Sequence, residues 1–136
     1  MQAEPWMAVR DVPDSVMIVE DDSDMRRLLE IVLNRNDRLS RDLSFDNASD
    51  ALGEILSGVC PAAILCDAGL PGMSGLRAVP LFREACPNAV IVIYTANPEG
   101  CSDAVTRGAD AVMSKATLPT QVVEHVAELL EQRTTS

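Results

Sequence analysis

The chain alternates between short apolar runs and longer segments whose apolar residues recur with helical spacing. Short runs of nearly continuous apolar residues are typical of strands that are covered on both faces, as in a parallel sheet. Runs of this kind occupy residues 15–20, 62–66, 89–95 and 110–114. A weaker run at residues 38–45 alternates between apolar and polar side chains, which predicts a strand at the edge of the sheet.

Amphipathic helices are predicted between these strands. Apolar residues at positions i, i+3, i+4 and i+7 form one helical face within each of the segments 25–33, 48–55 and 122–130. The helix that follows Gly75 contains Pro80, so we expect it either to start late or to lose one hydrogen bond there.

A strand followed by a helix, repeated along the whole chain, predicts an α/β fold. This alternation gives a parallel sheet of the five predicted strands, with helices on both faces and right-handed crossovers, a three-layer sandwich. We expect one domain over residues 15–132, preceded by a flexible arm at 1–14 and followed by a tail at 133–136.

Composition and charge indicate which kinds of partner the protein does not bind. Of the 136 residues, 47% are hydrophobic and only 3% are aromatic, so the core is expected to be aliphatic. A net charge of −10 argues against direct binding to DNA or to an anionic membrane surface. No apolar run approaches the roughly 20 residues that span a bilayer, and the first residues lack a signal-peptide core, so we expect a cytoplasmic protein.

Four cysteines are scattered along the chain without the spacing of a metal or redox motif: Cys60, Cys66, Cys86 and Cys101. Each of them lies in or beside a predicted helix or strand. We therefore expect four small buried side chains with free thiols, as is usual for proteins in a reducing compartment.

Polar and charged residues follow four of the five predicted strands. In chain order these residues are Glu20 and Asp21, then Asp67, then Thr95, then Lys115. Ligands of an open α/β sheet bind beyond the carboxyl ends of its strands. If the strand order is 2-1-3-4-5, the four strands with polar ends are neighbours, and their ends converge on one pocket.

Three carboxylates in such a pocket need a cation. Two like charges about 4 Å apart cost on the order of 4 kcal/mol at an effective dielectric constant near 20, so Glu20, Asp21 and Asp67 would repel one another. A ligand set made only of oxygen atoms favours a hard ion, and partly hydrated Mg²⁺ suits it. Lys115, the lone lysine among 11 basic residues, adds a compact ammonium where an arginine fork would be bulkier.

A nucleophilic carboxylate, a metal, an ammonium and a hydroxyl together describe phosphoryl transfer to an aspartate. Asp67 would attack phosphorus, Mg²⁺ and Lys115 would neutralise the phosphoryl oxygens, and Thr95 would donate a hydrogen bond to the product. Gly69 lets the loop backbone approach a tetrahedral group closely. Taken one at a time, Asp67 would be interpreted as a turn residue, Thr95 as an ordinary strand end and Lys115 as a solvated charge, and only their occurrence together at the strand ends reverses this.

Four short motifs occur in order along the chain: "VEDD" at 19–22, "DAGLPGMSG" at 67–75, "YTA" at 94–96 and "GADAVMSKA" at 108–116. With these motifs the chain resembles the receiver domain of bacterial two-component response regulators over about residues 15–132. The resemblance implies a flavodoxin-like sheet of order 2-1-3-4-5, as the strand ends require. It also implies phosphorelay signalling by a regulatory protein rather than by an enzyme.

The resemblance assigns a role to each pocket residue. Asp67 would accept phosphoryl from a phosphohistidine, with Thr95 and Lys115 as its catalytic partners. The residues at the Mg²⁺ would be Glu20, Asp21, Asp67 and Gly69. The phosphoryl donor would be a sensor histidine kinase or a histidine phosphotransfer protein docked on residues 25–27. The target would be a downstream effector protein bound through residues 98–130 of a monomer or weak dimer.

Two positions depart from the family's pattern. Val112 stands where the family usually has an aromatic residue that responds to phosphorylation, and it is too small and stiff for that role. Ala116 replaces the proline that usually follows the lysine, so we expect a trans peptide bond and a reshaped loop. These departures favour a second hypothesis, a receiver-shaped interaction module that acts without phosphate. A hydrolase of the haloacid-dehalogenase type is disfavoured, because Gly69 stands where that family has its second aspartate.

Overall fold

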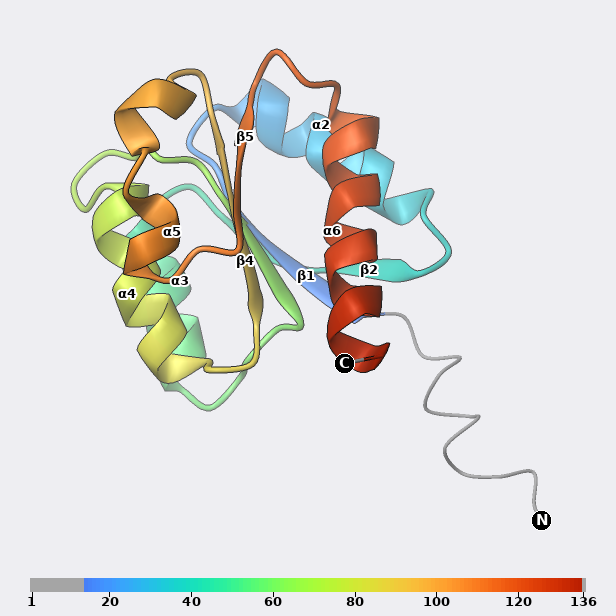
Figure 1. The fold of residues 1–136 in the computed structure, drawn as a ribbon, viewed down its shortest axis with the longest axis horizontal. Coiled ribbons are helices and arrows are strands. Elements are labelled where there is room, and N and C mark those ends of the chain that lie inside the picture. Colours follow the sequence, from blue (N-terminus) through green and yellow to red (C-terminus); the bar gives the residue numbers. More distant parts are fainter. Residues whose placement is uncertain (1–13, 136) are drawn as a thin grey trace.

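A computed structural model describes residues 14–135 and contains the predicted alternation of strands and helices (Figure 1). All but the last residue of the expected N-terminal arm lies outside the described residues, and that last residue, Asp14, begins the first strand. The elements are β1 (Asp14–Val19), α2 (Ser23–Asn34), β2 (Leu39–Phe45), α3 (Ala48–Leu56), β3 (Ala63–Cys66), α4 (Gly75–Ala85), β4 (Val90–Thr95), η1 (Pro98–Cys101), α5 (Ala104–Arg107), β5 (Ala111–Ser114) and α6 (Pro119–Thr135).

The strands form one five-stranded sheet in the order β2-β1-β3-β4-β5, which confirms the predicted order. Every neighbouring pair is parallel. β2 lies at an edge, as its alternating sequence predicts, and its register with β1 shifts between Val16 and Ile18. Because all strands run in one direction, the loops that follow them lie along the same edge of the sheet.

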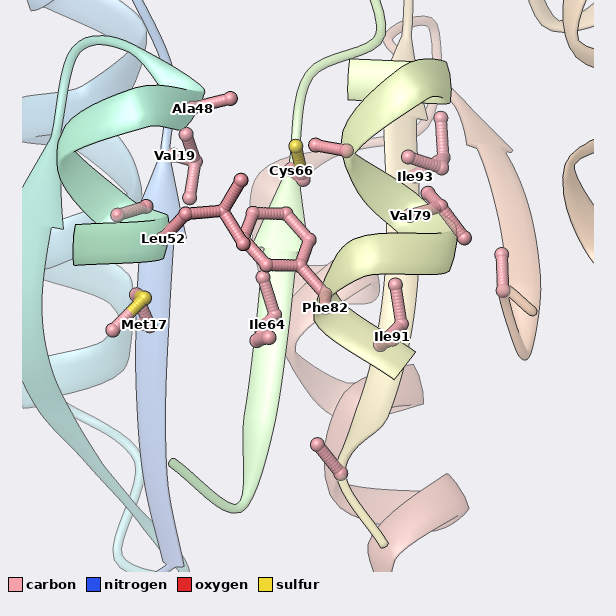
Figure 2. Packing of buried hydrophobic residues seen from close by; sticks show 14 of the residues in the cluster. Met17, Val19, Ala48, Leu52, Ile64, Cys66, Val79, Phe82, Ile91 and Ile93 are labelled. Atoms are coloured by element: carbon pink, nitrogen blue, oxygen red, sulfur yellow. The ribbon is translucent and has the colours of Figure 1, made fainter. Parts of the chain in front are cut away.

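Helices cover both faces of the sheet, so the molecule has three layers (Figure 1). α3, α4 and α5 lie on one face, and α2 and α6 on the other. Figure 2 shows the first apolar core, in which the ring of Phe82 reaches toward Leu52 and Ile64. The second core gathers Leu29 and Tyr94 with aliphatic residues of α6. Each large apolar side chain buried in this way contributes about 1.5–3 kcal/mol to folding.

Two expectations on helix boundaries can be compared with the structure. α4 begins at Gly75 and continues through Pro80, so the helix does not start late and instead lacks the hydrogen bond that an amide at Pro80 would donate, the second of the two expected outcomes. α6 continues to Thr135, three residues beyond the expected end of the domain, because its regular backbone outlasts the apolar pattern that marks its buried face. No helix among residues 14–135 combines the length and apolarity needed to cross a membrane.

The expectation of four free cysteines was wrong. Cys60 and Cys86 form a disulfide with a Cα–Cα distance of 5.7 Å, whereas Cys66 and Cys101 are buried free thiols. The bonded pair is 26 residues apart, and only the β3–α4 crossover brings the two residues together. The spacing of apolar residues within single helices and strands contains no information on the distance between Cys60 and Cys86 in the fold.

Candidate functional site

The carboxyl ends of four neighbouring strands bring the predicted site residues to one edge of the sheet. Two backbone hydrogen bonds extend the pairing of neighbouring strands one residue beyond the ends of β3 and β5. The Asp67 amide donates to the Val19 carbonyl at 2.9 Å, and the Lys115 amide donates to the Thr95 carbonyl at 2.8 Å. Asp67 is thereby held next to the end of β1, and Lys115 next to the end of β4.

Lys115 joins two of the predicted acidic residues. Its Nζ lies 2.8 Å from Glu20 Oε1 and 3.2 Å from Asp67 Oδ2, so the ammonium bridges the ends of β1 and β3. The Glu20 side chain is only 2% exposed, against 20% for Lys115 and 12% for Asp67. An ion pair at this depth is screened little by solvent, so removing the ammonium would leave a buried carboxylate uncompensated.

Burial and charge have opposite effects on the pKa values of Glu20 and Lys115. Burial raises the pKa of the Glu20 carboxyl, while hydrogen bonds from Lys115 and from the Asp22 amide act to lower it. Burial alone would lower the pKa of Lys115, but the Glu20 and Asp67 carboxylates outweigh it and raise that pKa. The ammonium is therefore held in its charged form. The Arg26 guanidinium also contacts this site, because it donates a hydrogen bond to the Glu20 carbonyl at 2.8 Å.

An acidic cluster lies next to the ammonium. Oxygen atoms of Glu20, Asp21 and Asp67 all lie within 4.8 Å of one another. The donor set consists only of carboxylate oxygens, which fits a hard divalent cation such as Mg²⁺. Asp22 has a different role, because its side chain caps α2 by accepting hydrogen bonds from the amides of Asp24 and Met25.

The loop after Asp67 is held by backbone contacts. Asp67 Oδ1 accepts a hydrogen bond from the Gly69 amide at 3.1 Å, and the Gly75 amide donates to the Ala68 carbonyl at 2.9 Å. Gly75 packs so closely that a Cβ on it would lie 2.0 Å from the Asp67 carbonyl oxygen. This role of Gly75 was missed in the sequence, where its position in the loop motif marks a turn and not a steric contact.

Thr95 is buried at the end of β4, and its Oγ1 accepts a hydrogen bond from the Asn97 amide at 3.1 Å. The proton of the Thr95 hydroxyl is not used in this hydrogen bond and can be donated to a second acceptor. Thr95 therefore stands where the sequence predicts it, at the strand end between those followed by Asp67 and Lys115.

The loop that carries Lys115 has its own anchoring. The Ala116 amide donates to Ser114 Oγ at 3.0 Å, a bond that a proline at this position would lack. Tyr94 Oη donates to the Thr117 carbonyl at 2.7 Å, which ties the loop to the penultimate residue of β4. No peptide bond among residues 14–135 is cis, which confirms the expected trans bond before Ala116. Ser114 and Tyr94 were not identified as site residues from the sequence.

Residues 16–127 match the family model of the response regulator receiver domain, and the chain belongs to this family. Domains of this family are regulatory domains of two-component systems, and the match is consistent with a role in phosphorelay signalling. A relative of established name is the DNA-binding transcriptional regulator NtrC of Proteus hauseri, 33% identical over 85 residues. That match covers 62% of this chain but only 17% of NtrC, so this chain corresponds to a small part of that protein.

Solved structures of receiver proteins share the fold. One is a CheY-like receiver domain protein from Methanospirillum hungatei JF-1, with a TM-score of 0.81 and 21% identity, covering 91% of this chain and 98% of that one. Another is a LuxR-family two-component response regulator from Aurantimonas sp. SI85-9A1, with a TM-score of 0.80 and 22% identity, covering 90% and 88% of the two chains. The flavodoxin-like sandwich predicted from the sequence is thus the family's fold.

Proposed function

We propose that Asp67 is the phosphoacceptor of this receiver domain. The observation that carries the proposal is the position of Lys115, whose ammonium contacts both Glu20 and Asp67 at the edge where the acidic cluster lies. An ammonium and a set of oxygen ligands around one carboxylate are the parts that phosphoryl transfer to an aspartate requires. The donor is a phosphohistidine on a sensor histidine kinase or a histidine phosphotransfer protein.

In the transfer, an Asp67 carboxylate oxygen forms a bond to phosphorus as the bond from phosphorus to the donor's imidazole nitrogen breaks. The electron pair of that bond stays on the imidazole. Lys115 moves its ammonium from the free carboxylate toward the phosphoryl oxygens, and the Thr95 hydroxyl donates a hydrogen bond to one of them. The Gly69 amide keeps the carboxylate oriented during the attack.

Glu20, Asp21 and Asp67 are the residues that would hold Mg²⁺, with the backbone of Gly69 completing the set. When bound there, Mg²⁺ supplies positive charge that neutralises the phosphoryl oxygens. Without it, the extra negative charge of a phosphoryl group would face three carboxylates. Transfer is therefore expected to depend on a divalent cation.

The phosphorylated form acts on a downstream effector protein, in the cytoplasm, as a monomer or weak dimer and without contacting DNA. The net charge of −10 supports a protein partner, since phosphate backbones repel an acidic surface. A second candidate is a receiver-shaped module whose binding does not depend on phosphate. It is favoured by Val112, which cannot report phosphorylation as an aromatic residue does, and by the Ser114-anchored loop at Ala116.

The test is phosphoryl incorporation from acetyl phosphate, followed by mass spectrometry of the intact protein. We expect one phosphoryl group on the wild type with Mg²⁺, none with excess chelator, and none on Asp67→Asn. Asp37→Asn is the matched control, because Asp37 is exposed in the turn between α2 and β2 at the opposite edge. No incorporation in the wild type, or equal incorporation in Asp67→Asn, would favour the phosphate-independent module.

A further inference from the structure

The Cys60–Cys86 disulfide lies at the edge of the sheet opposite to Asp67. Cys60 precedes β3, Cys86 follows α4, and Asp67 follows the far end of β3. In Figure 1 the turns before β3 and after α4 lie at the lower edge, away from the loops that follow the strands. The disulfide therefore has no part in the phosphoacceptor site, although the segment it closes carries Asp67.

The two bonded cysteines differ in exposure. Cys60 is exposed in the turn between α3 and β3, whereas Cys86 is 2% exposed and packs in the apolar core beneath α4. Thiol–disulfide exchange requires a thiolate to reach one of the two sulfurs. An external thiolate can reach Cys60, and Cys86 is then the sulfur that leaves.

The backbone of Cys86 is held in place independently of the disulfide. Each cysteine precedes a proline, Pro61 or Pro87, which biases the preceding residue toward extended conformations. Cys86, with φ −130° and ψ 78°, lies outside the helical region that a following proline disfavours. Its amide donates to the Phe82 carbonyl at 2.8 Å, and its carbonyl accepts from the Ala89 amide at 3.2 Å. Cys86 thus keeps its position when the bond opens, which favours its closing again.

We propose that Cys60 and Cys86 are a reversible thiol–disulfide site that exchanges with low-molecular-weight thiols. An external thiolate attacks Cys60 Sγ, the bond between the protein sulfurs breaks, and Cys86 leaves as a thiolate that takes up a proton. A second thiolate then attacks the mixed disulfide on Cys60, which releases the external disulfide and the Cys60 thiolate. The protein pair gains two electrons and two protons, and two external thiols are oxidised. Disulfides of proteins in reducing compartments are usually transient and redox-sensing in this way.

Reduction of the Cys60–Cys86 disulfide changes the contacts between the end of α4 and the turn before β3. The oxidised form ties the end of α4 to the turn before β3, in which Val59 is exposed next to Cys60 in the sequence. In the reduced form only hydrogen bonds and packing hold this turn to α4. A covalent input distinct from phosphorylation thus reaches the α3–α4 side of the molecule.

The experiment equilibrates the folded full-length chain with mixtures of reduced and oxidised glutathione. Free thiols are then alkylated with N-ethylmaleimide under denaturing conditions and counted by mass spectrometry. We expect two adducts, on Cys66 and Cys101, in oxidising mixtures and four in reducing mixtures, with peptide mapping linking Cys60 to Cys86. Amide exchange around Cys86 and Ala89 is expected to be faster by about tenfold or more in the reduced form.

Cys60→Ser should abolish the change in adduct number and mimic the reduced form in amide exchange, because an exposed side chain can be replaced without disturbing the core. Cys101→Ser is the control, since it removes a buried thiol and leaves the pair intact. Asp67→Asn should behave as the wild type. Four adducts in every mixture, two adducts even in the most reducing mixture, or amide exchange that does not respond would each overturn the proposal.

Discussion

At the scale of single residues, the site depends on a few contacts that fix one carboxylate. The charged members of the set could be predicted, since a carboxylate or an ammonium directly after a buried strand has few structural reasons to be there. The uncharged members could not. Gly75 acts through the absence of a side chain, and Ser114 acts through a local hydrogen bond, so neither leaves a distinctive pattern in the sequence.

Replacing Gly75 by alanine should displace the phosphoacceptor. The new methyl group would lie 2.0 Å from the Asp67 carbonyl oxygen, so the loop must move. We expect Gly75→Ala to lower the free energy of unfolding by about 2 kcal/mol and to slow phosphorylation of Asp67 by acetyl phosphate. Gly53→Ala is the control, because nothing lies within 4 Å of its added Cβ and alanine favours the helix. Equal behaviour of the two variants would contradict the steric role.

Removing the ammonium of Lys115 should expose the repulsion that it now balances. In Lys115→Met, Glu20 keeps its burial but loses its ion pair, so we expect a loss of about 2–3 kcal/mol in unfolding free energy without metal. Added Mg²⁺ should restore part of this loss, because it neutralises the same carboxylates. Urea unfolding with and without Mg²⁺ measures both effects, and a variant as stable as the wild type without metal would contradict them.

The buried Cys66 thiol should make stability depend on pH in the alkaline range. Burial, reinforced by the Asp67 and Glu20 carboxylates, raises the pKa of this thiol far above its usual range. The unfolded thiol ionises at about pH 8.5, so unfolding releases a proton above that pH and becomes more favourable. Compared with Cys66→Ala, the wild type should lose about 1.4 kcal/mol of stability per pH unit above that point. Parallel pH profiles for the two proteins would contradict the shift.

At the scale of elements, the strands and long helices follow from the hydrophobic pattern, because burial on one or both faces imposes a period that the residues must obey. The pattern fails where structure does not depend on burial. The last turn of α6 at residues 133–135 is held by the helical backbone, and the Cys60–Cys86 bond depends on how the β3–α4 crossover returns. The β5–α6 loop is held by polar contacts of Ser114 and Tyr94 and carries no apolar pattern.

Restoring the family's proline in this loop should cost stability. Ala116→Pro removes the amide that donates to Ser114 Oγ, so we expect the unfolding free energy to fall by about 1 kcal/mol. Ala116→Gly keeps the amide that donates to Ser114 Oγ and serves as the control for a substitution at this position. Urea denaturation of the three proteins separates the cases. A proline variant as stable as the wild type would mean that the Ser114 contact does not hold the loop.

At the scale of the whole molecule, the parallel sheet explains why distant segments form one site. The order β2-β1-β3-β4-β5 makes β1, β3, β4 and β5 neighbours, and their carboxyl ends share one edge. The polar strand ends were readable in the sequence and the strand order was implied by the family resemblance, so the placement of these residues at one edge could be predicted before their distances were known. The opposite edge holds the disulfide, and the α3–α4 unit connects the two edges.

The most direct measurement of the central claim is chemical trapping of the phosphorylated residue. Borohydride reduces an acyl phosphate to an alcohol, so a phosphorylated aspartate becomes homoserine, which peptide mapping by mass spectrometry locates. After incubation with acetyl phosphate and Mg²⁺, we expect homoserine at position 67 alone, and none when Mg²⁺ is withheld. Homoserine at position 21 or 22, or no conversion at any position with Mg²⁺ present, would contradict the assignment of Asp67 as the phosphoacceptor.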